Sequence, residues 1–356
     1  MNRERYYHMS SLKYNGKDVG LFTLCNSSGI VVRITNFGAR IVSLSVPDRD
    51  GRLCDVVQGF DSVEDYFPEN YDNYFGAVIG RYANRLAGGR IVVDGVVYQL
   101  PQNNGPNCLH GGPTGWHNQP FDVVEASERR LVLSLESPDG DNGFPGNVQV
   151  RVTYTLDDCD RLRIDYCAES DRATVINITN HSYWNLSGDL GSSVLDHILW
   201  IDADRYTPTD ATAIPLGEND SVQGTPFDFR IPKAIGRDIE DNHPQLVIGR
   251  GYDHNFVLNN RIGAGELRMA ASLYSPKSGI QMLLFTDAPG MQLYTGNYLD
   301  GTPGKGGVRY GFRSAVCLET QQYPDSPNRA WPESTGRLTP EKPFESSTVF
   351  GFKFNE

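Results

Sequence analysis

The sequence lacks several features that define whole classes of protein. Its 32 Lys and Arg residues are outnumbered by 44 Asp and Glu, which gives a formal net charge of −12. Because no basic field is available to contact phosphates, we expect neither nucleic acid nor an anionic membrane as a partner. No stretch approaches the roughly 18 apolar residues of a membrane span. No apolar segment follows the charged start at residues 1–8, so we expect no signal peptide.

Motifs for metals, cofactors and covalent catalysis are also missing. The six cysteines include no C-x-x-C pair, so we expect reduced thiols and a cytoplasmic location. The seven histidines form no H-E-x-x-H, which argues against a catalytic metal. Neither a G-x-G-x-x-G nor a G-x-S-x-G occurs, so we expect no nicotinamide cofactor and no serine nucleophile. The segment Gly301–Gly306 lacks the spacing of a phosphate loop and is interpreted as a surface loop.

Strand signals, in contrast, extend along the whole chain. The sequence is rich in Gly (37), Pro (21), Tyr (18) and Phe (16), the mixture that short strands and tight turns require. Asp94-Gly95 between two β-branched segments predicts a hairpin. A single helical turn, begun by a Ser62 cap, is expected at 62–66. The predicted strands are 30–35, 40–46, 90–93, 96–100, 131–135, 148–154, 162–166, 175–179 and 281–286.

Many strands without alternating helices indicate an antiparallel β-sandwich rather than a βαβ fold. No Ser/Gly linker, charge run or internal repeat divides the chain. We therefore predict an all-β protein with few short helices, formed by one large domain over residues 1–356. Its loops are expected to carry the chemistry.

Polar residues interrupt apolar or glycine-rich segments at several places. They are Asn84, Arg85, His110, His181, Asp253 and Glu319. Most of them have a structural alternative, such as a turn, a cap or a buried hydrogen-bond network. Glu319 is the strongest functional candidate because it follows the apolar run Val316–Leu318. A buried carboxylate is costly and has a raised pKa, and such groups cluster at functional sites.

The segments around these residues resemble the aldose 1-epimerase family. The matching segments, which occur in the family's order, are Gly80–Arg85, Leu109–Gly112, Asn180–Leu186, Gly251–His254, Gln292–Asn297, Leu318–Gln321 and the tail Pro324–Asn328. The resemblance implies a galactose mutarotase-like supersandwich. It also implies an isomerase that interconverts the α and β anomers of a free hexose, such as galactose or glucose, without a cofactor or a metal.

The resemblance also assigns roles to residues. It implies that Glu319 takes the proton of the C1 hydroxyl, that His181 protonates the ring oxygen O5, and that His110 donates a hydrogen bond nearby. The residues expected to hold sugar hydroxyls are Asn84, Arg85, Asp253 and Gln292. For its donor role, His181 is expected to be protonated in the resting protein. Either Trp184 or Phe75 is expected to lie against the sugar ring or to belong to the core.

Three other functions remain open at this stage. An epimerase of sugar phosphates would need two or more cations at the pocket, and the spacing of Arg81 and Arg85 does not place both inside. A sugar-binding sensor could share the fold without catalysis, although Glu319 and His181 are both present. A polysaccharide-degrading enzyme could use Asp253 and Glu319 as its carboxylates. In each case the partner is a sugar, and the protein is a monomer or a homodimer.

Overall fold

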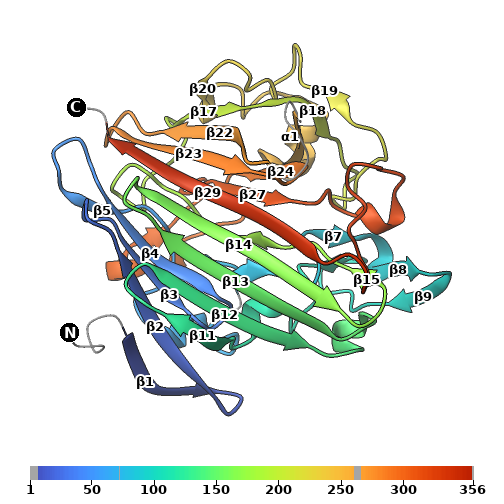
Figure 1. The fold of residues 1–356 in the computed structure, drawn as a ribbon. Coiled ribbons are helices and arrows are strands. Elements are labelled where there is room, and N and C mark those ends of the chain that lie inside the picture. Colours follow the sequence, from blue (N-terminus) through green and yellow to red (C-terminus); the bar gives the residue numbers. More distant parts are fainter. Residues whose placement is uncertain (1–6, 72, 260–265, 355–356) are drawn as a thin grey trace.

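The computed structural model of the protein describes residues 7–71, 73–259 and 266–354, and within them the largest sheet has nine strands (Figure 1). Every neighbouring pair in it is antiparallel. β29 lies beside β14 although the two strands are far apart in the chain. In spatial order the strands are β11 (Asp122–Ala126), β12 (Arg130–Ser137), β13 (Val148–Leu156), β14 (Arg161–Ser170), β29 (Phe344–Phe354), β23 (Ile280–Thr286), β22 (Arg268–Tyr274), β17 (Ile198–Ile201) and β20 (Lys233–Ala234).

Two five-stranded antiparallel sheets accompany the large one in the described part of the chain. The first consists of β1 (Tyr7–Tyr14), β2 (Lys17–Cys25), β3 (Val31–Thr35), β4 (Arg40–Pro47) and β5 (Leu53–Asp55). The second, here called the site sheet, has the order β19 (Asp220–Ser221), β18 (Ala203–Thr207), β21 (Asp253–Leu258), β24 (Gly290–Tyr294) and β27 (Cys317–Gln321).

Short strand pairs and turns complete the described fold. The pairs are β7 (Arg85–Leu86) with β10 (Cys108–Leu109), β6 (Val78–Ile79) with β16 (Thr179–Asn180), β15 (Thr174–Val175) with β28 (Arg337–Leu338), β25 (Thr302–Pro303) with β26 (Arg309–Tyr310), and β8 (Arg90–Val93) with β9 (Val96–Gln99). The helical elements are α1 (Pro244–Gly249) and the single 3-10 turns 64–66, 87–89, 116–118, 141–143, 235–237, 305–307 and 326–328. None of the helices in the described residues is long and apolar enough to cross a membrane.

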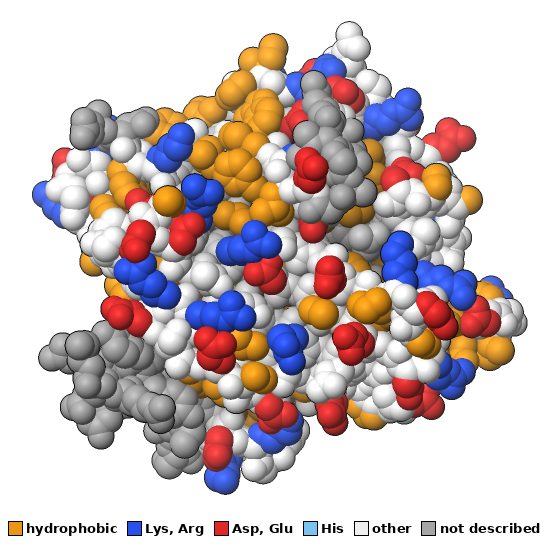
Figure 2. Space-filling model, viewed as in Figure 1, with side chains coloured by type: hydrophobic (Ala, Val, Ile, Leu, Met, Phe, Trp, Pro, Cys, Tyr) orange, Lys and Arg blue, Asp and Glu red, His pale blue; other side chains and the backbone are white. Residues whose placement is uncertain are grey.

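Alternating side chains explain how the large sheet covers the core. Along β13, Val150 and Val152 are buried while Gln149 and Arg151 are exposed, as expected for a strand with one face in solvent. Figure 2 shows acidic and basic side chains interspersed on one face of the molecule. The inner faces meet in one apolar cluster, which includes residues of all three large sheets. The all-β prediction is confirmed, whereas a single domain over residues 1–356 stays a prediction.

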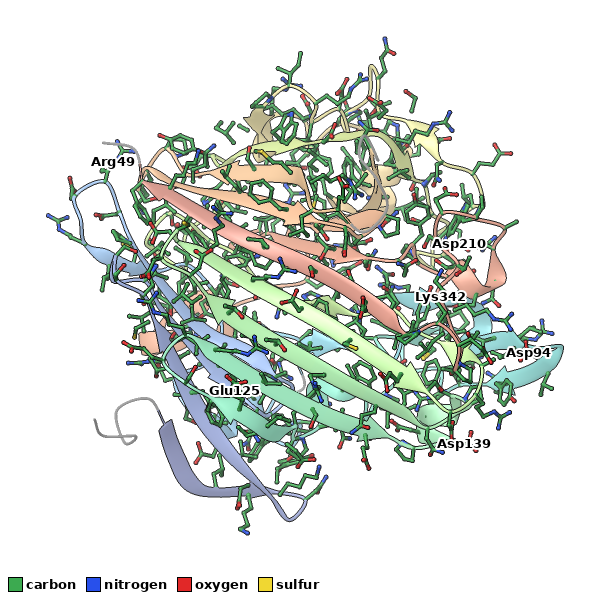
Figure 3. The ribbon with its side chains drawn as sticks, viewed as in Figure 1. Arg49, Asp94, Glu125, Asp139, Asp210 and Lys342 are labelled. Atoms are coloured by element: carbon green, nitrogen blue, oxygen red, sulfur yellow. The ribbon has the colours of Figure 1, made fainter. Side chains whose placement is uncertain are left out.

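The hairpin prediction is confirmed, but two local predictions are wrong. Asp94 lies at the tip of the β8–β9 hairpin (Figure 3), with φ of 49° at Asp94 and 80° at Gly95. The expected strand 175–179 is divided into β15 and β16, because each half pairs with a different partner. Ser62 does not cap the turn at 64–66, since that turn starts after Val63 and has no side-chain cap.

A buried arginine braces the loops beside the site sheet. Arg40 is 0% exposed, and its guanidinium donates hydrogen bonds to the Asn73 side chain and to the carbonyl oxygens of Asn73, Phe75 and His117, at 2.9–3.0 Å. Several directed donors on one rigid group can hold separate segments in a fixed geometry. Arg40 therefore ties strand β4 to the segments 73–75 and 116–118.

Replacing this arginine is expected to cost much of the protein's stability. Arg40→Met keeps most of the volume but leaves the carbonyl oxygens of Asn73, Phe75 and His117 buried without this donor, so we expect a loss of about 3–5 kcal/mol in the free energy of unfolding. Urea unfolding followed by tryptophan fluorescence measures the loss. Arg33→Met, at an exposed position of the neighbouring strand β3, is the matched control and should change stability by less than about 0.5 kcal/mol. Equal stability of the two variants would contradict the bracing role.

Candidate active site

The register of the site sheet gathers three predicted residues on one face. Asn255 pairs with Gln292, and Gln292 pairs with Glu319, so these side chains form a row across β21, β24 and β27. Paired residues of antiparallel strands project from the same face, and so do residues two positions apart on one strand. Asp253 therefore shares this face, and Gln292 Nε2 donates a hydrogen bond of 2.8 Å to its Oδ1.

His181 approaches this face from a different strand pair. It follows β16, which packs against β27. The main-chain N–H of His181 donates to the Ala77 carbonyl oxygen at 2.8 Å, and the His181 carbonyl oxygen accepts from the Gly76 N–H at 3.0 Å. Gly76 has φ of 66°, and a Cβ there would lie 2.1 Å from the Ile41 oxygen, so this close approach requires glycine. In this position the imidazole of His181 lies against Glu319, with 3.6 Å between His181 Nε2 and Glu319 Oε2.

Asn84 and His110 are held together by reciprocal hydrogen bonds. The main-chain N–H of Asn84 donates to Nδ1 of the His110 ring at 3.1 Å. The main-chain N–H of His110 donates in return to the main-chain oxygen of Asn84 at 3.1 Å. Both residues have positive φ, 65° and 53°. Burial above all, with the nearby His181 and Arg85, holds the pKa of His110 well below 6.5. Because its Nδ1 is an acceptor, neutral His110 carries its proton on Nε2, in the form of a hydrogen-bond donor.

Arg85 supplies positive charge to the same region. Its Nε donates a hydrogen bond of 3.0 Å to Asn104 Oδ1, which fixes the plane of the guanidinium. Arg85 pairs with Leu109, the residue before His110, and its charge lowers the pKa of Glu319 and of His110. The structure thus brings together all seven predicted site residues, from three separate parts of the fold.

The electrostatics of the central pair differ from the sequence-based expectation. Glu319 and His181 are only 2% and 5% exposed. Burial raises the pKa of Glu319 well above 4.5, and the Asp253 carboxylate raises it further. Burial lowers the pKa of His181 to about 3. The expectation of a protonated His181 in the resting protein is therefore wrong. Both shifts favour the neutral forms, an uncharged His181 and a protonated Glu319.

The aromatic side chains around the pair were missed by the sequence analysis. Trp184 is 0% exposed and packs against Phe350, so it belongs to the core. Phe75 is also buried in an apolar cluster. The rings next to His181 are instead Tyr74 and Tyr183, both near-parallel to the imidazole, with centroids 5.7 Å and 5.0 Å away. Tyr183 could have been found from its position two residues after His181.

Two other basic groups noted in the sequence have structural roles. The Arg81 guanidinium donates to the carbonyl oxygens of Ser137, Pro145 and Gly146, at 2.8–2.9 Å. Lys305, in the glycine-rich loop, donates to Asp55 Oδ2 at 2.7 Å. The segment interpreted as a surface loop contains strand β25 and the start of the turn at 305–307, so the loop interpretation holds only in part. Since Arg81 is engaged elsewhere, it does not supply the second arginine that a sugar phosphate would favour.

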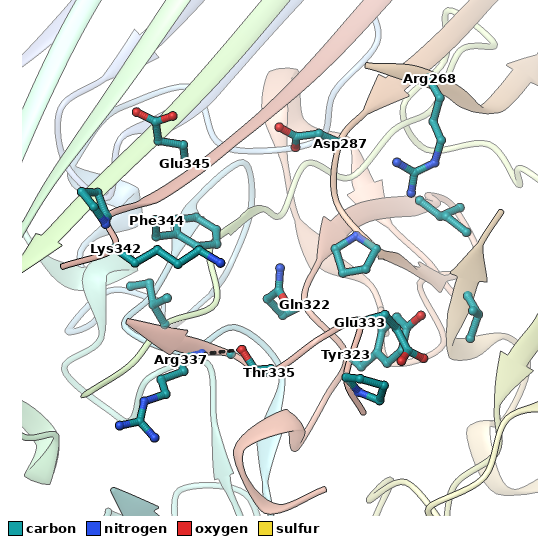
Figure 4. A pocket seen from close by; sticks show the side chains of 17 residues that line it. Arg268, Asp287, Gln322, Tyr323, Glu333, Thr335, Arg337, Lys342, Phe344 and Glu345 are labelled. Atoms are coloured by element: carbon teal, nitrogen blue, oxygen red, sulfur yellow. Dashed lines mark hydrogen bonds between the residues drawn. The ribbon is translucent and has the colours of Figure 1, made fainter. Parts of the chain in front are cut away.

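A large cavity lies beside the segment that follows β27 but is separate from this cluster. It has a volume of about 600 Å³ and is lined by Gln322 and Tyr323 and by charged side chains of both signs, such as Arg268, Asp287 and Lys342 (Figure 4). None of the seven predicted site residues lines it. The candidate active site is therefore the polar cluster on the site sheet.

Solved structures of carbohydrate epimerases share this strand-rich fold. The sequence model described as "Aldose 1-epimerase" matches residues 20–351, so the chain belongs to the aldose 1-epimerase family. The resemblance stated from the sequence is thereby confirmed.

Named relatives and solved structures agree with this assignment. The galactose mutarotase of Bos taurus is 43% identical over 332 residues, covering 92% of each chain. The aldose 1-epimerase of Escherichia coli is 38% identical over 343 residues, covering 96% of this chain and 97% of that protein. The crystal structure of an aldose epimerase homologue from C. elegans matches with a TM-score of 0.85 at 30% identity, covering 94% of this chain and 99% of that chain. The galactose 1-epimerase of Lactobacillus acidophilus matches with a TM-score of 0.83 at 30% identity, covering 98% of both chains.

Proposed function

We propose that the protein interconverts the α and β anomers of a free hexose, such as D-galactose or D-glucose, by acid–base opening and closing of the sugar ring. The observation that carries the proposal is the buried His181–Glu319 pair, with Nε2 and Oε2 3.6 Å apart. Opening the ring requires removal of the C1 hydroxyl proton and protonation of O5. One imidazole and one carboxylate that share a proton are sufficient for both transfers.

We assign the base role to Glu319 and the acid role to His181. In the free protein the pair's proton lies on Glu319, so the proton has to move when sugar binds. Hydrogen bonds from sugar hydroxyls to the carboxylate favour its charged form, and the charge of Arg85 acts in the same direction. The proton then lies on His181, which delivers it to O5. After rotation about the C1–C2 bond, the reverse transfers close the ring from the other face.

The remaining site residues are proposed to orient the sugar. Asp253 accepts hydrogen bonds from hydroxyls, and Gln292 holds this carboxylate in place through the 2.8 Å bond to its Oδ1. Arg85 and Asn84 donate to other hydroxyls. His110 presents its Nε2–H as a neutral donor. Each of these interactions requires a hydroxyl partner, so the site should discriminate against sugars that lack one.

The proposal is tested by following the optical rotation of freshly dissolved α-D-galactose and α-D-glucose with and without the protein. We expect a faster approach to the same final rotation, because the enzyme changes the rate and not the equilibrium. Inorganic phosphate should not inhibit, since the Arg81 guanidinium is engaged with main-chain carbonyl oxygens. An unchanged rate with a folded protein would contradict the proposal, and strong inhibition by phosphate would favour a sugar-phosphate substrate.

The pH dependence of kcat/KM should reflect the two shifted pKa values of the free protein. The active form holds one proton in the pair. Uptake of a second proton requires a charged His181, whose pKa is lowered to about 3, so we expect the acid limb below pH 6.5. Loss of the only proton gives the alkaline limb, which the raised pKa of Glu319 places well above pH 4.5. Coupled dehydrogenase assays, corrected for spontaneous mutarotation, measure both limbs. An acid limb above pH 6.5 would contradict this arrangement.

We further propose that the protein acts in the cytoplasm, as a monomer or a homodimer, with a sugar rather than a nucleic acid or a membrane as its partner. All six cysteines are free thiols, which is typical of a reducing compartment. The net charge of −12 opposes binding to phosphate backbones and anionic lipids.

A further inference from the structure

A third potential metal ligand lies beside the catalytic pair. Ligand atoms of His181, Cys317 and Glu319 all lie within 4.8 Å of one another. Cys317 and Glu319 are two residues apart on β27 and therefore face the same side of the strand. All three residues are at least nine-tenths buried. The seven histidines form no ligand pair in the sequence, so this cluster arises only from the packing of β16 against β27.

One distance in the cluster already matches a zinc ion, and the ligand atoms, which spread up to 4.8 Å, would draw together around the metal. Zinc binds Cys sulfur at about 2.3 Å and His nitrogen or carboxylate oxygen at about 2.0–2.2 Å, in a tetrahedral arrangement. Two such ligand atoms are then roughly 3.3–3.7 Å apart. The 3.6 Å between His181 Nε2 and Glu319 Oε2 falls in this range. Three protein ligands leave a fourth position, which water would fill.

The chemistry of the donors points in the same direction. Glu319 Oε2 is buried without a hydrogen-bond partner. A thiolate and a carboxylate together balance the charge of a divalent ion, and the nearby Asp253 adds negative charge. The mixed set of sulfur, nitrogen and oxygen favours zinc over the harder Mg²⁺ or Ca²⁺. Cys317 has no role in the proposed proton transfers, which leaves its sulfur available.

We propose that His181, Cys317 and Glu319 form an inhibitory Zn²⁺ site, at which the metal competes with the sugar. Zinc occupies the lone pairs of Nε2 and of the carboxylate that the proton transfers require. On binding, the thiol and the carboxylic acid lose their protons to water, and no redox change is involved. The inference rests on the proposed roles of His181 and Glu319 for the inhibition, but not for the binding.

Direct binding is tested with Co²⁺, because a cobalt–thiolate bond gives a charge-transfer absorption in the near ultraviolet. We expect this absorption with the wild-type protein, its displacement by Zn²⁺, and its loss in Cys317→Ala. Cys159→Ala, at an exposed cysteine, is the matched control and should retain it. Absence of the absorption in the wild-type protein, or its persistence in Cys317→Ala, would overturn the inference whether or not the protein is a mutarotase.

Inhibition is tested by mutarotation assays at increasing Zn²⁺. We expect the zinc concentration for half inhibition to rise at least tenfold in Cys317→Ala and Cys317→Ser, and also to rise with added galactose. Basal activity of both variants, expected within about threefold of wild type, shows that they are folded. Equal inhibition of wild type and variants would overturn the inference. If cobalt binds through Cys317 but neither the wild type nor any variant mutarotates a sugar, the metal site is supported and the proposed function is contradicted.

Discussion

Glu319→Gln is expected to lower kcat by about 10³- to 10⁴-fold, at the upper end of what a positioned acid or base contributes. The amide keeps the shape of the side chain and most of its contacts, but it cannot take a proton from the C1 hydroxyl. Because Glu319 holds the pair's proton in the free protein, the variant also removes the proton that His181 would receive. Polarimetry on α-D-galactose, relative to the spontaneous rate, measures the loss.

The same substitution should not destabilise the protein near neutral pH. The pKa of Glu319 is higher in the folded protein than the 4.5 of an unperturbed carboxyl, so the folded state holds a proton that the unfolded state loses. Stability therefore falls as pH rises from 4.5 toward the raised pKa. Glu319→Gln removes this dependence, and a Tm equal to or above that of wild type is expected at pH 7. Glu345→Gln, at an exposed position of β29, is the matched control and should change neither activity nor Tm.

A combination of near-wild-type activity and unchanged stability in Glu319→Gln would exclude Glu319 as the base. Low activity with a much lower Tm would indicate damage to the fold instead. Only low activity with a retained Tm supports the assigned role.

The fold class follows from local signals, whereas the sheet topology does not. Asp94-Gly95 predicts the β8–β9 hairpin because the conformation of a tight turn is determined by a few adjacent residues. The pairing of β14 with β29 joins residues about 180 positions apart and has no local signature. The strand expected at 175–179 fails for the same reason, since its two halves pair with segments that lie far apart in the chain.

The members of the site could be named from sequence motifs, but their protonation could not. Glu319 stands out because a carboxylate is rare within an apolar segment. The pKa of His181 depends instead on burial and on the charge of Arg40, which approaches from another sheet. Tyr74 lies beside His181 only through loop packing, so nothing in its own segment marks it.

His181→Asn is expected to lower kcat by about 10²- to 10⁴-fold, because the amide cannot deliver a proton to O5. The acid limb of the pH profile should disappear in this variant, since it reports uptake of a second proton by the imidazole. His243→Asn is the matched control. His243 caps α1 with its side chain, a role that asparagine fills equally well, and we expect wild-type activity.

The double variant Glu319→Gln/His181→Asn separates a working pair from two independent groups. If the residues share one proton, either single substitution already breaks the transfer. The kcat of the double variant should then lie within about tenfold of that of the less active single variant. Independent contributions would multiply instead, so that the double variant would lose roughly the product of the two single losses. Measuring kcat for all four proteins at one pH decides between the two cases. A multiplicative loss would mean that the 3.6 Å between Nε2 and Oε2 reflects proximity alone, without a shared proton.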